Sequence, residues 1–262
     1  MKAIILAAGE GKRLRPLTDN IPKCMVNLFG VSLLQRQVDI FRKSGIDDIS
    51  VITGYRSDKI NIQSVRYFHN DKYDTTNMVE TLFCAKEVMS GSVIVSYGDI
   101  VFQKNVLEKL VQSNDDFSIV VDKNWYEYWK TRFPNPLDDA ESLLIDESGY
   151  IADIGQKVKN IDSIMGQYIG LMKFQGDGLE FLKKHYEDLR RIAQGGKNPL
   201  NPNLPFEKSY MTDLLNDLIA EKCRLKAIPI NNGWLELDTI SDFTLYEKLH
   251  NENSLKFYSP DA

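Results

Sequence analysis

Short apolar runs alternate with segments of helical spacing through the first 121 residues, and this alternation constrains the fold more than any other feature. The runs KAIIL at Lys2–Leu6 and ISVIT at Ile49–Thr53 have the pattern of strands that are buried on both faces. Between them, Val31–Lys43 places its apolar residues at helical spacing. Repeated strand–helix units of this kind predict an α/β protein with a mostly parallel sheet and helices on both faces.

The same patterns extend along the chain. Further strands are predicted at Ser64–Phe68, Ser92–Ser96, Phe117–Val121, Glu141–Ile145, Tyr150–Ile154, Gln167–Phe174 and Arg224–Ile230. Further helices are predicted at Asn77–Met89, Gln103–Gln112, Gly178–Gln194, Tyr210–Glu221 and Ile240–Leu249. We interpret residues 1–262 as one domain, with a core at 1–121, an inserted half at 122–215 and a return to the core at 216–262.

Charge and cysteine content exclude several classes of protein. The net charge of -5 is spread along the chain without a long basic run, which argues against nucleic acid as a partner. The three cysteines are far apart and show no CxxC spacing, so we expect neither a disulfide framework nor a zinc site. The first residues lack the pattern of a signal peptide, and no apolar run is long enough to span a membrane. A cytoplasmic protein is expected.

One stretch carries the first functional signal: LAAGEGKRLRPLTDNIPK, residues 6–23, follows a predicted buried strand. Gly9 and Gly11 begin a dinucleotide-type pattern, but Leu14 stands where its third glycine belongs, and no P-loop is present. Glycines that expose backbone N–H groups, with Arg13 and Lys23 nearby, suit an anion such as phosphate. From residue types alone, a solvated basic loop is an equally good explanation.

The complete stretch resembles the signature L-A-A-G-x-G-x-R-L-x-P-L-T-x-x-x-P-K of nucleoside-triphosphate-dependent nucleotidyltransferases, which include sugar-1-phosphate and phosphocholine nucleotidyltransferases. The resemblance implies a Rossmann-like α/β/α sandwich in which residues 1–121 bind the nucleotide. It also implies that Arg13 and Lys23 are the catalytic cations that stabilise the phosphates. The expected nucleotide-binding residues are Leu6, Ala7, Ala8, Gly9, Glu10, Gly11, Thr76, Asn77 and Gly98.

Two later aspartates match the metal ligands of this family. Asp99 ends the stretch SYGD, where the family carries a Gly-Asp pair, and Asp238 lies in WLELDT, which is similar to the family's W-x-E-x-D-[ST] segment. The resemblance implies that both hold Mg²⁺, an ion that accepts one or two carboxylates together with phosphate oxygens and water. Taken alone, Asp99 is better explained as a turn former and Asp238 as part of the N-cap region of the last helix.

The segment Asp71–Ala85 resembles a region of phosphocholine and aminoalkylphosphonate cytidylyltransferases, at a place where sugar nucleotidyltransferases carry a Gly-rich segment. The likeness continues in three stretches: IGQK at 154–157, GQYIGL at 166–171 and YMTDLL at 210–215. Two departures leave the charge of the acceptor open, because Gln167 replaces the usual Glu and Glu80 stands near a common Ser. The inserted half is expected to bind the acceptor and to supply a lid. The candidate acceptor-binding residues are Lys157, Tyr168, Trp234 and Glu236.

These observations predict a cytidylyltransferase that uses CTP and Mg²⁺. It would transfer CMP to a small phosphomonoester or phosphonate, such as a phosphocholine-like, phosphoamino-acid-like or aminoalkylphosphonate acceptor, for the decoration of cell-surface glycans. One alternative is a sugar-1-phosphate nucleotidyltransferase that uses UTP or dTTP. The other is a non-catalytic nucleotide sensor, which would not need both aspartates and both cations. No membrane partner is expected, Lys157 is equally well explained as a solvated lysine, and a homodimer is left open.

Overall fold

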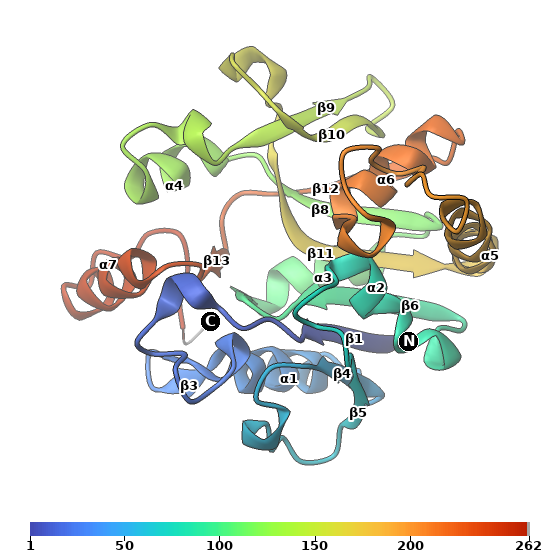
Figure 1. Ribbon diagram of the computed structural model, residues 1–262. Helices are drawn as coiled ribbons and strands as arrows, with labels where there is room; N and C mark the ends of the chain where they lie inside the picture. Colours follow the sequence, from blue (N-terminus) through green and yellow to red (C-terminus); the bar gives the residue numbers. More distant parts are fainter. Residues whose placement is uncertain (261–262) are drawn as a thin grey trace.

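Within residues 1–260, which the computed structural model describes, a seven-stranded sheet forms the centre of the protein (Figure 1). Its strand order is β12-β8-β11-β6-β1-β4-β5, and only β11 runs antiparallel to its neighbours. The predicted mostly parallel mixed sheet is therefore confirmed. The strands are β1 (Lys2–Ala7), β4 (Ile49–Thr53), β5 (Arg66–His69), β6 (Ser92–Tyr97), β8 (Phe117–Asp122), β11 (Gln167–Gln175) and β12 (Leu225–Ile230).

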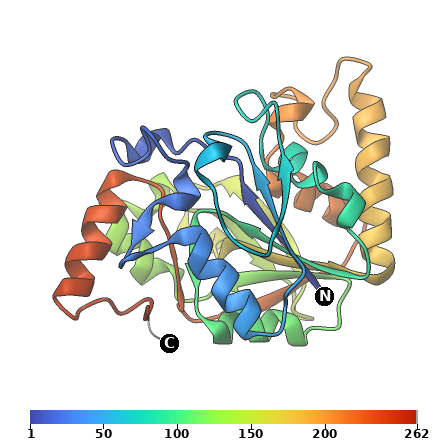
Figure 2. The ribbon, with the colours of Figure 1, turned by 90° about the horizontal axis from the view of Figure 1, so that it is seen from below.

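Helices cover both faces of this sheet. Successive residues of a strand point to opposite sides, so apolar residues of one strand can pack against helices on both faces. In β1, Ala3 and Ile5 belong to one apolar cluster, whereas Ile4 and Leu6 belong to the other. The first cluster includes α1 (Leu33–Lys43), α3 (Lys104–Gln112), α4 (Trp125–Arg132) and α7 (Ile240–Asn251). The second includes α2 (Met78–Phe83), α5 (Gly176–Ala193) and α6 (Met211–Ala220). In Figure 2, α5 stands at the right edge of the molecule and α7 at the left edge.

Three short strand pairs accompany the sheet. They are β2 (Asn27–Leu28) with β3 (Val31–Ser32), β7 (Ile100–Phe102) with β13 (Trp234–Glu236), and β9 (Glu141–Ile145) with β10 (Ile151–Lys157). The sequence does not predict β7 or β13, because three residues are too few to show a strand period. It also misses α4, whose aromatic-rich sequence is more typical of strands than of helices.

One predicted helix is shorter than expected. In the stretch 77–89, α2 ends at Phe83 and a separate turn of 3₁₀ helix follows at Lys86–Val88. The division of the chain at residues 121 and 215 stays a prediction. β11 falls within the segment 122–215 and yet lies between β6 and β8 in the central sheet. Among the described residues, no helix has the length and apolar character that crossing a membrane requires.

Candidate active site

The glycine-rich loop connects the end of β1 to a turn of 3₁₀ helix at Lys12–Leu14. Gly11 has a φ of 71°, in the left-handed region that favours glycine, and a Cβ there would lie 2.9 Å from the Cβ of Lys23. At Gly98, after β6, a Cβ would lie 2.6 Å from the carbonyl oxygen of Leu6. Both glycines therefore permit close packing of two loops at the carboxyl ends of neighbouring parallel strands, where ligands bind in open α/β sheets.

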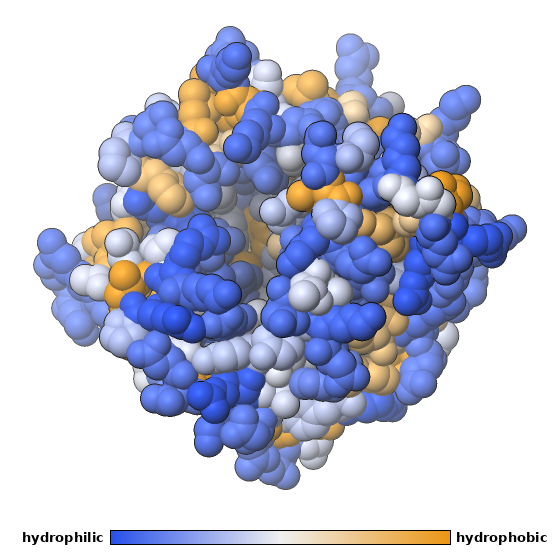
Figure 3. All heavy atoms as spheres, in the orientation of Figure 1, coloured by the Kyte–Doolittle hydropathy of each residue, from blue (hydrophilic) through white to orange (hydrophobic). Residues whose placement is uncertain are grey.

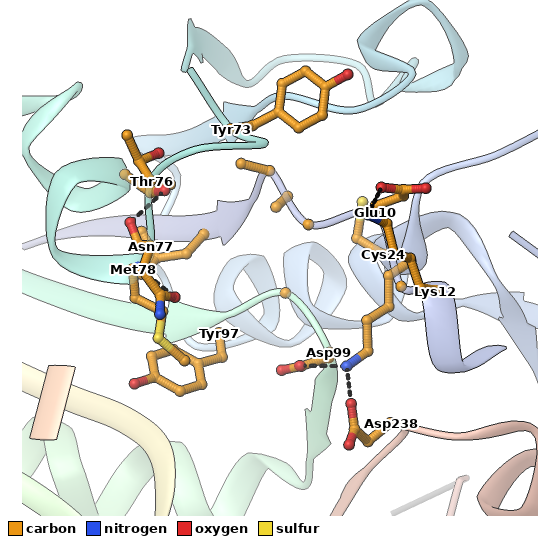
Figure 4. Close-up of a pocket in the computed structure, with 18 of the residues that line it drawn as sticks. Glu10, Lys12, Cys24, Tyr73, Thr76, Asn77, Met78, Tyr97, Asp99 and Asp238 are labelled. Atoms are coloured by element: carbon orange, nitrogen blue, oxygen red, sulfur yellow. Dashed lines mark hydrogen bonds and ion pairs between the residues drawn. The ribbon is translucent and has the colours of Figure 1, made fainter. Parts of the chain in front are cut away.

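These two loops form one side of a cavity of about 420 Å³. All nine predicted nucleotide-binding residues line it, and so do Arg13, Lys23, Asp99 and Asp238. Figure 3 shows a hollow near the middle of this face, bordered mainly by hydrophilic side chains. In Figure 4, Thr76 and Asn77 lie across the cavity from Glu10 and Asp238. The structure thus brings together residues that are more than 200 positions apart in the chain.

The short pair of β7 and β13 explains why the two aspartates meet. Asp99 directly precedes β7 and Asp238 lies two residues after β13, and the antiparallel register places Ile100 opposite Glu236. The backbone N–H of Leu237 also donates a hydrogen bond of 2.9 Å to the carbonyl oxygen of Asp99. The two carboxylates are therefore placed by a ladder of backbone hydrogen bonds rather than by flexible loops.

Lys23 lies between these carboxylates. Its Nζ donates to Asp99 Oδ2 at 2.7 Å and to Asp238 Oδ1 at 2.9 Å, as the dashed lines in Figure 4 show. Burial alone would lower the pKa of Lys23, but Asp99 and Asp238 outweigh it and raise this pKa above its ordinary value. Arg13 forms an ion pair with Asp238 Oδ2 at 2.5 Å. Lys23 is thus charged, and both predicted cations contact a predicted metal ligand.

The donor atoms fit a magnesium ion. Asp99 Oδ1 is buried and has no hydrogen-bond partner, so one oxygen that faces this region lacks a donor or a cation. Among residues 1–260, no group of three or more acidic, histidine or cysteine side chains forms a complete metal site. Mg²⁺ does not need one, since two carboxylates and phosphate oxygens of a bound nucleotide satisfy its preference.

On the opposite wall, Thr76 and Asn77 already have hydrogen-bond partners. Asn77 caps α2 through its Oδ1, which accepts from the N–H of Met78 at 2.9 Å. Its amide nitrogen makes only a long contact of 3.4 Å with the carbonyl oxygen of Lys208. Thr76 donates to the carbonyl oxygen of Lys72 and accepts from Asn70. Of the two, Asn77 therefore retains the more available donor for a base.

A second cavity of about 190 Å³ adjoins the first. The predicted acceptor residues Tyr168, Trp234 and Glu236 line it, and Arg13 and Asp238 line both cavities. Lys157 lines neither: it is exposed at the last position of β10, so the structure does not bring it to the predicted acceptor site. Arg13 is the cation that lies at the boundary of the two cavities.

The second cavity contains Glu236 and two further carboxylates, Asp139 and Glu141, that the sequence does not single out. Burial, reinforced by Asp139, raises the pKa of Glu141 to about 7, although part of this residue is exposed to solvent, and no cation contributes to the shift. Burial also raises the pKa of Asp139, which accepts a hydrogen bond from Trp129 Nε1. Burial raises the pKa of Glu236 to about 7, against the opposing effect of Arg132.

Gln167 holds the backbone of Glu141 through two hydrogen bonds. Its amide nitrogen donates to the carbonyl oxygen of Glu141 at 2.6 Å, and its amide oxygen accepts from the N–H of the same residue at 3.1 Å. A glutamate at position 167 has no N–H with which to make the first of these bonds when it is ionised. The exchange of Glu for Gln in the GQYIGL stretch therefore does not empty the cavity of negative charge, because Glu141 supplies it.

Comparisons with known proteins identify related nucleotidyltransferases. Residues 3–151 match the family model described as a MobA-like NTP transferase domain. The CTP:phosphoglutamine cytidylyltransferase of Campylobacter jejuni is 41% identical over 254 residues, which are 92% of this chain and 97% of that protein. The choline-phosphate cytidylyltransferase of Streptococcus pneumoniae is 36% identical over 123 residues, which are 45% of this chain and 53% of that protein.

A solved structure shares the fold. The CTP:phosphocholine cytidylyltransferase from Streptococcus pneumoniae superposes with a TM-score of 0.70 at 22% sequence identity, over 95% of this chain and 98% of that one. This likeness supports the predicted Rossmann-like sandwich.

Proposed function

The chain belongs to the family of MobA-like NTP transferase domains, and we propose from this membership and from the two adjoining cavities that it transfers CMP from CTP to a small phosphorylated acceptor. The observation that carries the proposal is the shared wall. Arg13 and Asp238 line both cavities, so a nucleotide in the larger one and an acceptor in the smaller one would meet beside them. The family membership supports the enzyme class, and the relatives' names support CTP.

The reaction that suits this arrangement is a direct displacement. A phosphoryl oxygen of the acceptor attacks the α-phosphorus of CTP, the bond from that phosphorus to the bridging oxygen of the β-phosphate breaks, and pyrophosphate leaves. Positioning and neutralisation of charge supply most of the catalysis in such reactions. We assign Lys23 and Arg13 to the phosphates, where charge grows as pyrophosphate departs, and the glycine-rich loop to the triphosphate.

We assign Asp99 and Asp238 to Mg²⁺, which supplies Lewis-acid polarisation of the α-phosphate when it is bound. In the structure Lys23 pairs with both carboxylates, through one hydrogen bond to each. With a nucleotide present, Lys23 would have phosphate oxygens as additional partners, and the flexible lysine stem lets Nζ reach them. The unpartnered Oδ1 of Asp99 supports a cation at this position.

We propose further that the acceptor carries a positively charged nitrogen. Glu141 faces a cavity in which Arg13 is the one cationic side chain among the lining residues, and Arg13 is already paired with Asp238. An ammonium group would stabilise the ionised form of Glu141, whose pKa burial raises to about 7. The aromatic residues Tyr168, Tyr210 and Trp129 line the same cavity, and aromatic rings can bind a cation. Both phosphoglutamine and choline phosphate, named for the two relatives, contain such a nitrogen.

A screen of nucleotides against acceptors tests the proposal. Purified protein with Mg²⁺ is supplied with CTP, UTP or dTTP and with phosphocholine, phosphoethanolamine, 2-aminoethylphosphonate, phosphorylated amino acids or glucose 1-phosphate, and pyrophosphate release is measured. We expect turnover with CTP and an amino-bearing acceptor. Turnover that requires UTP or dTTP with a sugar phosphate would favour the sugar-nucleotide alternative, and nucleotide binding without turnover on any acceptor would favour the sensor.

We also propose a cellular setting for this reaction. A CDP-activated small molecule is a suitable donor for the decoration of surface glycans, and cytoplasm is where CTP is available. The three cysteines Cys24, Cys84 and Cys223 are free thiols in the structure, which suits a reducing compartment.

A further inference from the structure

Arg132, at the end of α4, is buried among charged partners outside both cavities. Its side chain is 1% exposed and lines neither cavity. Nε donates to Asp242 Oδ1 at 3.0 Å, one terminal nitrogen donates to Asp242 Oδ2 at 3.2 Å, and the other donates to Glu236 Oε2 at 2.8 Å. All three nitrogen atoms of the guanidinium group are therefore used, in the forked geometry that lysine cannot reproduce.

The two carboxylates that Arg132 holds flank Asp238 in the chain. Glu236 is the last residue of β13, and Asp242 lies in the first turn of α7. Asp242 Oδ2 accepts from the N–H of Asp238 at 3.2 Å and from the N–H of Thr239 at 2.9 Å. Arg132 thus connects to the backbone of Asp238 through one intervening carboxylate.

A pair of tyrosines holds the strand on the same side. Tyr128 Oη accepts from the N–H of Glu236 at 2.9 Å, and Tyr246 Oη donates to the carbonyl oxygen of Glu236 at 2.9 Å. The guanidinium group of Arg132 lies 5.4 Å from the centre of the Tyr128 ring. The backbone on both sides of Asp238 is consequently held by hydrogen bonds from α4 and α7, whereas its carboxylate projects into the wall shared by the two cavities.

We propose that Arg132 is a positioning residue for cytidylyl transfer: by holding Glu236 and Asp242 it fixes the direction in which Asp238 presents its carboxylate. The inference rests on the proposed function, since it takes Asp238 as a ligand of the divalent cation. Partners that orient the ligands of a metal ion commonly change its affinity by about tenfold to a hundredfold when they are removed. Arg132 would act in this way without touching nucleotide, acceptor or metal.

The test measures Mn²⁺ binding in the presence of CTP by electron paramagnetic resonance, alongside kcat, the KM for CTP and the melting temperature. We expect Arg132→Met to weaken Mn²⁺ binding about tenfold to a hundredfold and to lower kcat, with little change in the KM for CTP. Arg132→Lys should recover part of the melting temperature because it keeps the charge. It should not recover Mn²⁺ affinity, because one ammonium group cannot donate to Glu236 and to both oxygens of Asp242 in the same geometry.

Leu182→Ala is the matched control for lost stability, since Leu182 is fully buried in the apolar cluster on the other face of the sheet. It should lower the melting temperature and leave Mn²⁺ affinity unchanged. Wild-type Mn²⁺ affinity in Arg132→Met would overturn the proposal, and so would an equal loss of affinity in Leu182→Ala. If Arg132→Met fails to fold, the Mn²⁺ affinity of Arg132→Lys is compared with those of the wild-type protein and Leu182→Ala instead.

Failure of this proposal is distinguishable from failure of the proposed function. A wild-type protein that binds CTP and Mn²⁺ but transfers CMP to no acceptor would contradict the function and leave the Arg132 comparison intact. An enzyme that transfers CMP normally in both Arg132 variants, with unchanged Mn²⁺ affinity, would contradict only the role of Arg132.

Discussion

The two adjoining cavities differ in how their charges are balanced. Lys12, Arg13 and Lys23 line the larger cavity, and each forms an ion pair with a carboxylate that lines the same cavity. The smaller cavity has Arg13 as the one cation among its lining residues, together with the carboxylates Asp139, Glu141, Glu236 and Asp238. The larger cavity is therefore suited to a triphosphate with its metal ion, and the smaller one is suited to a ligand that brings its own positive charge.

Loss of a metal ligand should have the largest effect on turnover, and it would sharpen the comparison of the two cavities. Asp99→Asn and Asp238→Asn should each reduce kcat by about a hundredfold to a thousandfold, because charge stabilisation at the α-phosphate is lost in the transition state. Turnover with saturating Mg²⁺ and a thermal melt measure this. Asp58→Asn, on the exposed surface, is the control and should have wild-type turnover. Near-normal rates in both site variants would contradict the metal assignment.

Removal of a cation from the larger cavity should have the next largest effect. We expect Arg13→Ala and Lys23→Ala to lower kcat by more than they raise the KM for CTP, since charge on the leaving pyrophosphate grows toward the transition state. Each change should cost about 10²-fold in kcat/KM. Initial rates over a matrix of CTP and acceptor concentrations separate the two parameters. A rise in KM alone would mean that these cations only anchor the nucleotide.

The two cavities differ in how much of each could be predicted from the sequence, because different parts of the chain build them. The larger one is lined by a contiguous loop that directly follows β1, so its signature survives in one stretch of eighteen letters. The resemblance also located Asp99 and Asp238. It gave no reason why they should meet, because that depends on β7 and β13, which are too short to be recognised.

The smaller cavity could be predicted only in part. Glu141 is the first residue of β9 and Asp139 ends a polar loop, and neither position carries a local pattern that sets it apart from solvated residues. In the sequence, nothing distinguishes Arg132 from other basic residues, and only the fold places Asp242 and Glu236 beside it. Lys157 is the opposite case, because a likeness in sequence selected a side chain that the structure leaves in solvent, and its role stays a prediction. Whether these side chains line a cavity depends on packing between residues that are far apart in the chain.

The pH dependence should separate the two cavities. Protonation of Glu141 removes the charge that would pair with a cationic acceptor, and burial raises its pKa to about 7. The kcat/KM for the acceptor should therefore fall on the acid side, by roughly tenfold between pH 8 and pH 6 from this group alone. Glu141→Gln should remove this part of the acid limb. An unchanged profile in the variant would show that another group titrates.

The raised pKa of Glu141 also predicts a pH dependence of stability, and its direction is opposite to that of activity. The carboxyl of Glu141 binds its proton more tightly in the folded protein, so its contribution to stability is complete below pH 4.5 and is lost as the pH rises through 7. At pH 8, Glu141→Gln should thus melt at a slightly higher temperature than the wild-type protein, since solvent screens a partly exposed carboxylate, and near pH 5 the difference should shrink. Thermal melts at both pH values measure this. A variant that is less stable at pH 8 would contradict the assigned environment of Glu141.

A substitution at Asn77 that alters base selection should show the smallest effect. Cytosine and uracil present opposite hydrogen-bonding groups at two positions, and each mismatch costs about 1–3 kcal/mol, so we expect CTP to exceed UTP by roughly tenfold to several hundredfold in kcat/KM. Asn77→Ser keeps a side chain that can cap α2 but removes the amide donor, and it should narrow the ratio by a few-fold. An unchanged ratio would assign base recognition to the backbone around Ala7 and Ala8 instead.

The most direct test of the account compares two acceptors that differ only in the ammonium group. Phosphoethanolamine and ethyl phosphate are supplied in turn with CTP and Mg²⁺, and kcat/KM is measured at pH 8 for the wild-type protein and for Glu141→Gln. We predict that the wild-type protein prefers phosphoethanolamine by about tenfold or more, and that the variant loses most of this preference while its KM for CTP is unchanged. Equal use of both acceptors by the wild-type protein, or a preference that survives in Glu141→Gln, would contradict the account.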